Sequence, residues 1–140
     1  MLKPKKIKYN KQHRGRLKGQ YHKKSLLKFG SYGLQAKESC WLTAKQIEAL
    51  RRVITRVIKR EGTLWFRIFP HKPISTRVPE SRMGAGKGAI THWVATIKDG
   101  IILCEISDIS PELAKKVLTL ANHKLPIKTK IIRNKCIKKI

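Results

Sequence analysis

Two apolar runs flank a short polar turn in the second half of the chain. Ile90–Ile97 reads ITHWVATI, Lys98–Gly100 reads KDG, and Ile101–Ile106 reads IILCEI. Short runs rich in β-branched and aromatic residues predict strands. Asp-Gly between two such runs indicates a hairpin, because these residues tolerate the positive φ angles of a two-residue turn. We therefore expect Ile90–Ile106 to form a β-hairpin.

Other strand signals lie on both sides of this stretch. Thr63–Phe69 reads TLWFRIF, while Ile74–Val78 and Ile127–Ile132 are shorter runs rich in β-branched residues. Pro70 follows the first of them, and proline ends a strand because it has no N–H to donate to a neighbour. These runs predict three further strands.

A helix is predicted upstream of the aromatic run. Thr43 is a good N-cap and Gln46 follows three residues later, which is the spacing of a capping box. Apolar side chains recur at helical spacing from Ile47 to Ile58, with arginines on the remaining positions. Gly62 is expected to end this helix.

A second helix is expected to begin near Ser110, with Pro111 in its first turn and Pro126 as its stop. The elements together predict a single strand-rich α+β domain over residues 37–132, with two helices packed on the sheet. A basic extended arm at residues 1–36 precedes this domain, and a basic tail at residues 133–140 follows it.

The charge balance dominates the composition, because 33 Lys and Arg residues oppose 8 Asp and Glu residues, a formal net charge of +25. A compact domain with this charge repels itself, which favours a polyanionic partner whose phosphates release counterions on contact. An anionic membrane surface and a merely solvated surface are the alternatives. No apolar run reaches the roughly 18 residues of a membrane helix. Cys40, Cys104 and Cys136 have the spacing of neither a zinc site nor a disulfide framework.

The first 36 residues contain eleven Lys and Arg residues and no Asp or Glu. Glycines interrupt any helical period in this segment, and Tyr9, Tyr21, Phe29 and Tyr32 are scattered among the cations. We expect an extended arm that orders on a partner, with its cations on phosphates and its aromatic rings on bases. A disordered solubilising tail is the alternative.

A glycine-rich loop is predicted at Arg82–Gly88, which reads RMGAGKG. Glycine permits positive φ angles and a close approach of the backbone to a ligand. A nucleotide-phosphate loop is disfavoured, because Gly88 follows Lys87 where a P-loop needs Ser or Thr, and the glycine spacing is not that of a dinucleotide fold. A mobile loop without a task is a further alternative, but a loop pressed against RNA is favoured.

Signals for catalysis are thin. The eight acidic residues have no motif context for acid–base chemistry, and the five histidines are dispersed. We therefore expect no enzyme activity, no cofactor, no metal site and no small-molecule substrate. A phosphotransferase using Gly84–Gly88 would need the missing Ser or Thr. A membrane-active or chromatin-type cationic protein fits poorly with the folded strands expected around Trp65 and Trp93.

Several motifs together make the chain resemble, from about Met1 to Ile132, the universal bacterial-type family of large-subunit ribosomal protein number sixteen. They are KQHRGR at residues 11–16, FG-x-YGLQA at 29–36, W-x-RIFP at 65–70, RMG-x-GKG at 82–88 and LPIKT at 125–129. The resemblance implies an α+β fold seated in a large-subunit rRNA cleft near the A-site tRNA. It also implies a role in late subunit assembly.

The expected contacts fall into two sets. The arm and the first helix are expected to bind rRNA through Lys3, Lys5, Lys6, Lys8, Lys11, His13, Arg14, Arg16, Lys18, Arg51, Arg52, Arg56 and Arg60. The glycine-rich loop is expected, from the resemblance, to face the A-site tRNA and the peptidyl-transferase region through Arg77, Arg82, Met83, Gly84, Gly86, Lys87 and Gly88. In some bacterial members the arginine that matches Arg82 is hydroxylated. The expected partners are thus large-subunit rRNA, A-site tRNA and neighbouring ribosomal proteins, with no membrane.

Some positions depart from the family pattern. Glu61, His71 and His92 stand where the family usually has Gly, Asp and Tyr, which indicates a diverged member. The chain has 23 Lys against 10 Arg, together with 17 Ile, a bias expected from an A+T-rich coding genome. We therefore expect an organellar ribosome, with a mitochondrion favoured over a plastid and a bacterial cytoplasm as the remaining alternative.

Overall fold

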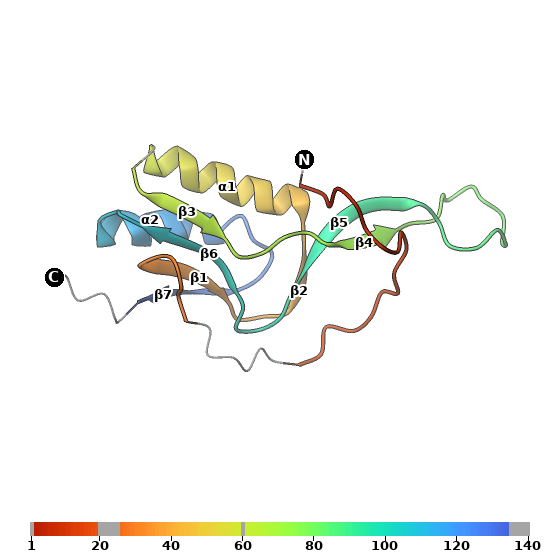
Figure 1. Cartoon of the computed structure of the whole chain (residues 1–140), viewed down its shortest axis with the longest axis horizontal. Coiled ribbons are helices and arrows are strands. Elements are labelled where there is room, and N and C mark those ends of the chain that lie inside the picture. Colours follow the sequence, from red (N-terminus) through yellow and green to blue (C-terminus); the bar gives the residue numbers. More distant parts are fainter. Residues whose placement is uncertain (1, 20–25, 60, 135–140) are drawn as a thin grey trace.

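The computed structural model describes residues 2–19, 26–59 and 61–134 (Figure 1). The rRNA contact expected of Arg60, part of the predicted arm (residues 20–25) and most of the predicted tail (residues 135–140) lie outside these ranges. Within them the chain forms seven strands and two helices: β1 (Tyr32–Ala36), β2 (Cys40–Thr43), α1 (Ala44–Ile58), β3 (Thr63–Phe66), β4 (Lys72–Ser75), β5 (Ile90–Ile97), β6 (Ile102–Ser107), α2 (Pro111–Asn122) and β7 (Thr129–Arg133).

The strands form two antiparallel sheets, one with the order β3-β6-β1-β7 and the other with the order β2-β5-β4. Together with the two helices they confirm the predicted single α+β domain. The two sheets are joined by two consecutive pairs of strands. The chain runs from β1 to β2 and from β5 to β6, and β1 pairs with β6 in the first sheet while β2 pairs with β5 in the second. At the bend, the Gly100 N–H donates to the Ala36 carbonyl and the Ala36 N–H donates to the Ile101 carbonyl, each at 2.9 Å.

The predicted hairpin of residues 90–106 is wrong. The Asp99–Gly100 turn is present, with Gly100 at φ +89°, but β5 and β6 on its two sides belong to different sheets. A turn motif reports local backbone geometry and does not choose the partner of each strand. Pairing with β1 and β3 instead buries all six residues of β6, which a hairpin open on one face does not do.

The sequence also missed a central strand, because Tyr32–Ala36 was assigned to the end of the basic arm. The structure places these residues in β1, between β6 and β7. The strand is short and contains Gly33, so its own sequence carries a weak strand signal. The folded sheet thus begins before residue 37, where the sequence predicted the domain to start.

The predicted helix starts are confirmed. The Gln46 N–H donates to Thr43 Oγ1 at 3.3 Å and the Thr43 N–H donates to Gln46 Oε1 at 2.9 Å, which completes the capping box of α1. Ser110 caps α2 by accepting from the Leu113 N–H at 3.3 Å. The end of α1 differs from expectation, since Lys59 at φ +49° closes the helix before Gly62 is reached.

The core lies where the two helices pack against the sheets and against each other. Its fully buried side chains come from α1, α2 and both sheets, and include Leu34, Leu42, Leu50, Ile54, Leu103 and Leu118. By contrast, β4, β5 and the loop that joins them extend away from the helices (Figure 1). The glycine-rich loop therefore stands at the far end of a hairpin anchored in the domain.

Candidate nucleic-acid interface

The basic arm lies along the β4–β5 hairpin. Lys72 Nζ, on β4, donates to the carbonyl of Arg14, and Lys87 Nζ, in the loop, donates to the carbonyl of Gln12. In return, Lys11 Nζ donates to the carbonyl of Lys87. These three contacts bring together two segments that are far apart in the sequence. We call the surface formed by residues 11–16, β4 and the loop the arm–hairpin surface.

Trp41 on β2 contacts two cations of this surface. The Arg14 guanidinium carbon lies 5.8 Å from the indole centroid, and Lys72 Nζ lies 5.0 Å from it. Both distances are within the range of a cation–π interaction. Neither Trp41 nor Lys72 was predicted as a site residue, because nothing near them in the sequence indicates that the arm folds back onto them.

The arm–hairpin surface is hollowed at the base of the loop. A hollow of about 360 Å³ is lined by Gln12 and Arg14 from the arm, Pro73, Ile74 and Ser75 from β4, and Thr76, Arg77 and Lys87 from the loop. The hollow thus brings together Arg14, a predicted rRNA contact, and Lys87, a residue of the predicted loop. The start of the arm lies on another part of the hairpin, where Lys3, Lys5 and Lys6 line a second hollow with Ile90 and Trp93.

The loop is organised by its own arginine. The Arg77 guanidinium donates to Ser81 Oγ at 3.1 Å, to the Gly84 carbonyl at 2.9 Å and to the Arg82 carbonyl. Arg77 therefore links the backbone of the loop from within. The sequence grouped it with the residues that are expected to face tRNA. At the base, the Thr76 N–H donates to the Ala89 carbonyl at 3.2 Å, and a Cβ on Gly88 would come within 2.4 Å of the Thr76 carbonyl oxygen.

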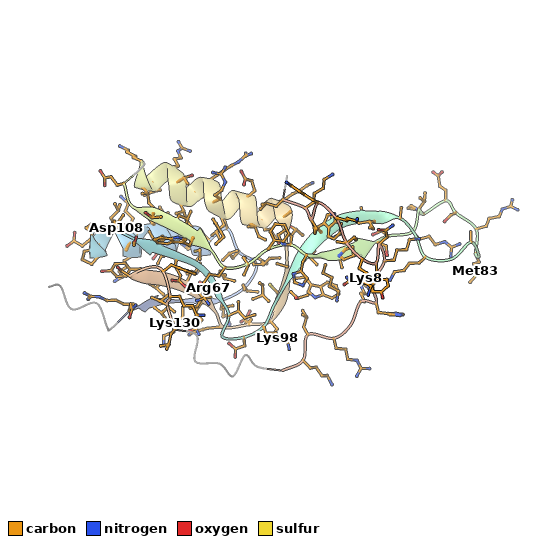
Figure 2. All side chains as sticks on the ribbon, viewed as in Figure 1. Lys8, Arg67, Met83, Lys98, Asp108 and Lys130 are labelled. Atoms are coloured by element: carbon orange, nitrogen blue, oxygen red, sulfur yellow. The ribbon has the colours of Figure 1, made fainter. Side chains whose placement is uncertain are left out.

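The tip of the loop requires glycine for its backbone conformation. Gly84, Ala85 and Gly86 have φ angles of +112°, +55° and +74°. A Cβ at Gly84 or Gly86 would meet nothing within 4 Å, so free space is not the constraint there. Met83, next to these residues, is 98% exposed and stands at the far end of the molecule (Figure 2). The loop thus presents its tip entirely to the surroundings.

In the part of the chain that the structure describes, the cations of the arm–hairpin surface form no ion pair, although the loop contains Glu80. The ion pairs among the described residues are Arg51–Glu48 (2.7 Å), Arg52–Glu48 (3.2 Å), Arg67–Glu105 (2.7 Å) and Lys128–Glu38 (3.7 Å). Within residues 2–19 and 72–89, therefore, no Lys or Arg lies within 4.0 Å of a carboxylate. His13, Arg16 and Lys18 are also exposed.

The helix arginines form a separate set. Arg51, Arg52 and Arg56 lie on the exposed side of α1, and hydrogen bonds from Arg51 and then Arg52 lower the pKa of Glu48 to about 2. Arg51 lines a hollow together with Leu2, at the start of the arm. The structure thus places Arg51 beside the beginning of the arm, and α1 lies apart from the glycine-rich loop (Figure 1).

The described residues offer little for catalysis. No group of three or more His, Cys, Asp or Glu side chains among them could hold a metal ion. Burial raises the pKa of the Cys104 thiol to about 12 and, together with nearby Glu38, that of Cys40 to about 11, so neither is a ready nucleophile. In the described part of the chain, neither helix is long and apolar enough to cross a membrane.

Comparison with known proteins agrees with the motifs. Residues 4–132 match the sequence profile of the family described as ribosomal protein L16p/L10e. The chain is 56% identical over 135 residues to large ribosomal subunit protein uL16c of Porphyra purpurea, covering 96% of this chain and 97% of that protein. It is 55% identical over 137 residues to uL16c of Thalassiosira pseudonana (98% and 100% covered) and 56% identical over 134 residues to uL16c of Cyanidium caldarium (96% and 96% covered).

These relatives are chloroplast proteins, so they support the expected organellar origin but favour a plastid over the mitochondrion. They are structural ribosomal proteins and not enzymes, in agreement with the thin catalytic signals of the sequence. A profile that matches nearly the whole chain, and relatives more than half identical along it, show that the chain belongs to the L16p/L10e family of ribosomal proteins.

Proposed function

We propose that this protein is a structural constituent of the large subunit of a plastid ribosome and binds large-subunit rRNA through the arm–hairpin surface. The observation that carries the proposal is the docking of the arm on the hairpin, which gathers Arg14, Lys72 and Lys87 without a carboxylate beside them. Such a set of charges is costly in isolation and is neutralised by a polyanion.

The backbone phosphates of RNA fit this surface in charge and in shape. Each phosphate that a Lys or Arg neutralises releases condensed counterions, which supplies most of the sequence-independent affinity. The hollow between Gln12, Arg14 and Lys87 is open and lined by both arm and loop. A phosphate seated there would be held by both segments at once. The exposed cations of residues 3–8 and of α1 would extend the same contact along the rRNA.

We also infer that the loop reaches towards the A-site tRNA near the peptidyl-transferase centre and that the protein enters the subunit late in assembly. Three features support the direction of the loop: its projection from the domain, the full exposure of Met83 and the exposure of Arg82 (Figure 2). Late entry is inferred from the family resemblance alone. Arg77 gives the loop a fixed shape from within. A fixed loop loses less conformational entropy when it contacts tRNA.

The test is the salt dependence of binding to plastid large-subunit rRNA. We expect the logarithm of the affinity to fall linearly with the logarithm of the salt concentration, and Arg14→Gln to reduce the slope by about 1. Lys116→Gln, on the exposed side of α2 away from the hairpin, is the matched control and should keep the slope of the parent. A flat salt dependence, or equal slopes for both variants, would contradict the proposal.

A further inference from the structure

A stacked aromatic pair, with one ring exposed and the other half-buried, lies on the four-stranded sheet, away from the arm–hairpin surface. Phe29 stacks on Trp65 of β3 with 6.2 Å between ring centroids and 26° between ring planes. Phe29 is 59% exposed, so one face of its ring meets the solvent. Neither residue has a role in the proposed contacts of the arm–hairpin surface. An aromatic ring exposed to solvent at a fixed position offers a π-face on which a flat ligand can stack.

A buried carboxylate fixes the position of this ring. Glu105 of β6, the register partner of Trp65, has a fully buried side chain. Its Oε2 accepts the backbone N–H groups of Lys28, Phe29 and Gly30 at 3.0, 2.7 and 2.8 Å.

Arg67 binds both the carboxylate and the segment that carries Phe29. Its Nη1 donates to Glu105 Oε1 at 2.7 Å and to the Leu26 carbonyl at 3.1 Å. The segment that carries Phe29 is therefore tied to the sheet on both sides of the ring. Because the backbone is already fixed, little conformational freedom remains to be lost when a ligand stacks on Phe29.

The surroundings of the pair are basic. Residues 26–31 and strands β1, β3, β6 and β7 contain one acidic residue, Glu105, and it is buried. Lys28, next to Phe29 in the chain, is exposed, and the side chain of Arg67 is a quarter exposed. An aromatic face bordered by cations suits a ligand that combines a flat π-system with a phosphate.

We propose that Phe29, backed by Trp65, is a stacking shelf for one unpaired nucleobase of RNA, with Lys28 beside the phosphate of that nucleotide. The proposal rests on the RNA binding inferred above and adds a contact to a base rather than to the backbone. Unstacked bases in RNA loops and bulges bind aromatic side chains in this way, and every base offers a π-face.

The experiment uses the full chain labelled with 5-fluorotryptophan, whose three tryptophans give separate ¹⁹F NMR signals. Trp65→Phe assigns the signal of Trp65. The labelled protein is titrated with an adenosine octanucleotide and, in parallel, with an abasic octamer of the same backbone charge. We expect both to bind, but only the adenosine octamer to shift the Trp65 signal.

Phe29→Ala should abolish that shift and weaken binding of the adenosine octamer by about fivefold or more, the contribution of one base–aromatic stack. The fold is retained in this variant, because Glu105 binds the backbone of Phe29 and not its ring. Leu120→Ala removes a part-exposed apolar side chain of α2 that lies in neither proposed contact, and should change neither quantity.

Two outcomes overturn the proposal in distinguishable ways. If both octamers bind and the Trp65 signal stays in place, the shelf is wrong while backbone binding stands, and the aromatic pair would then belong to the interface with an apolar protein segment. If neither octamer binds, RNA binding by this chain fails and the shelf fails with it.

Discussion

Glu105 shows how much one side chain can organise. It is the fully buried acid of the described chain, and it connects the segment just before β1 to the middle of the four-stranded sheet. Figure 2 shows its partner Arg67 over the same sheet. Sequence alone could not identify this role, because the glutamate and its partners are far apart in the chain. Its position in an otherwise apolar strand was the only available signal.

Glu105→Gln tests this role. The amide keeps the size of the side chain but directs an NH₂ group at backbone donors and leaves Arg67 without its anion. We expect a loss of about 2–3 kcal/mol in the free energy of unfolding, measured by urea denaturation, since hydrogen bonds to charged groups are worth about 1.5–3 kcal/mol. Glu38→Gln, whose pair with Lys128 is exposed, should cost less than about 1 kcal/mol. Equal losses would contradict this reading of Glu105.

At the level of elements, local sequence signals predicted strand bounds and helix starts well but did not predict how the strands pair. The bounds of β5 and the N-caps of α1 and α2 follow from residues within a few positions, and the sequence predicted them. The partners of β6 are β1 and β3, which lie far upstream in the chain, and no local pattern encodes these pairings. The same reason explains why the arm residues were recognised as basic but their docking beside Trp41 was missed.

The glycine-rich loop is the element whose shape depends most on one residue. Lys in place of Arg77 keeps the charge but has no planar fork to bind Ser81 and Gly84 together. Arg77→Lys should therefore loosen the loop, and trypsin should cut after Arg82 several times faster.

The free energy of unfolding should change by less than about 0.5 kcal/mol in this variant, because the loop is exposed. Arg56→Lys, an exposed change on α1, is the control and should leave the cleavage rate as it was. Unchanged cleavage after Arg82 in Arg77→Lys would mean that Arg77 does not organise the loop.

For the whole molecule, stability should fall in acid. Burial alone would raise the pKa of Glu105, but hydrogen bonds from Gly30, Phe29 and Arg67 outweigh it and hold that pKa below its usual value. A group with a lowered folded pKa stabilises the protein above its unfolded pKa of about 4.3, and this stability is lost as pH falls through the folded pKa. The rise of the net charge above +25 acts in the same direction.

We therefore expect the melting temperature to fall steadily below about pH 4.3. Glu105→Gln should be less stable at neutral pH but should lose less on acidification, and thermal melts of both proteins between neutral and acidic pH measure the difference. Parallel curves for the two proteins would show that Glu105 does not contribute to the pH dependence.

The position of β1 between β6 and β7 has a consequence for synthesis of the chain. Tyr32 pairs with Ile106 on one side and with Arg133 on the other, so β1 finds its neighbour β7 only after all the strands and helices between them have been made. Such pairings between distant residues form slowly. Until they form, the nascent chain exposes a polycationic N-terminus beside an unpaired strand edge, a combination that invites premature association. RNA or a chaperone that bound this segment early would cover the strand edge during that interval.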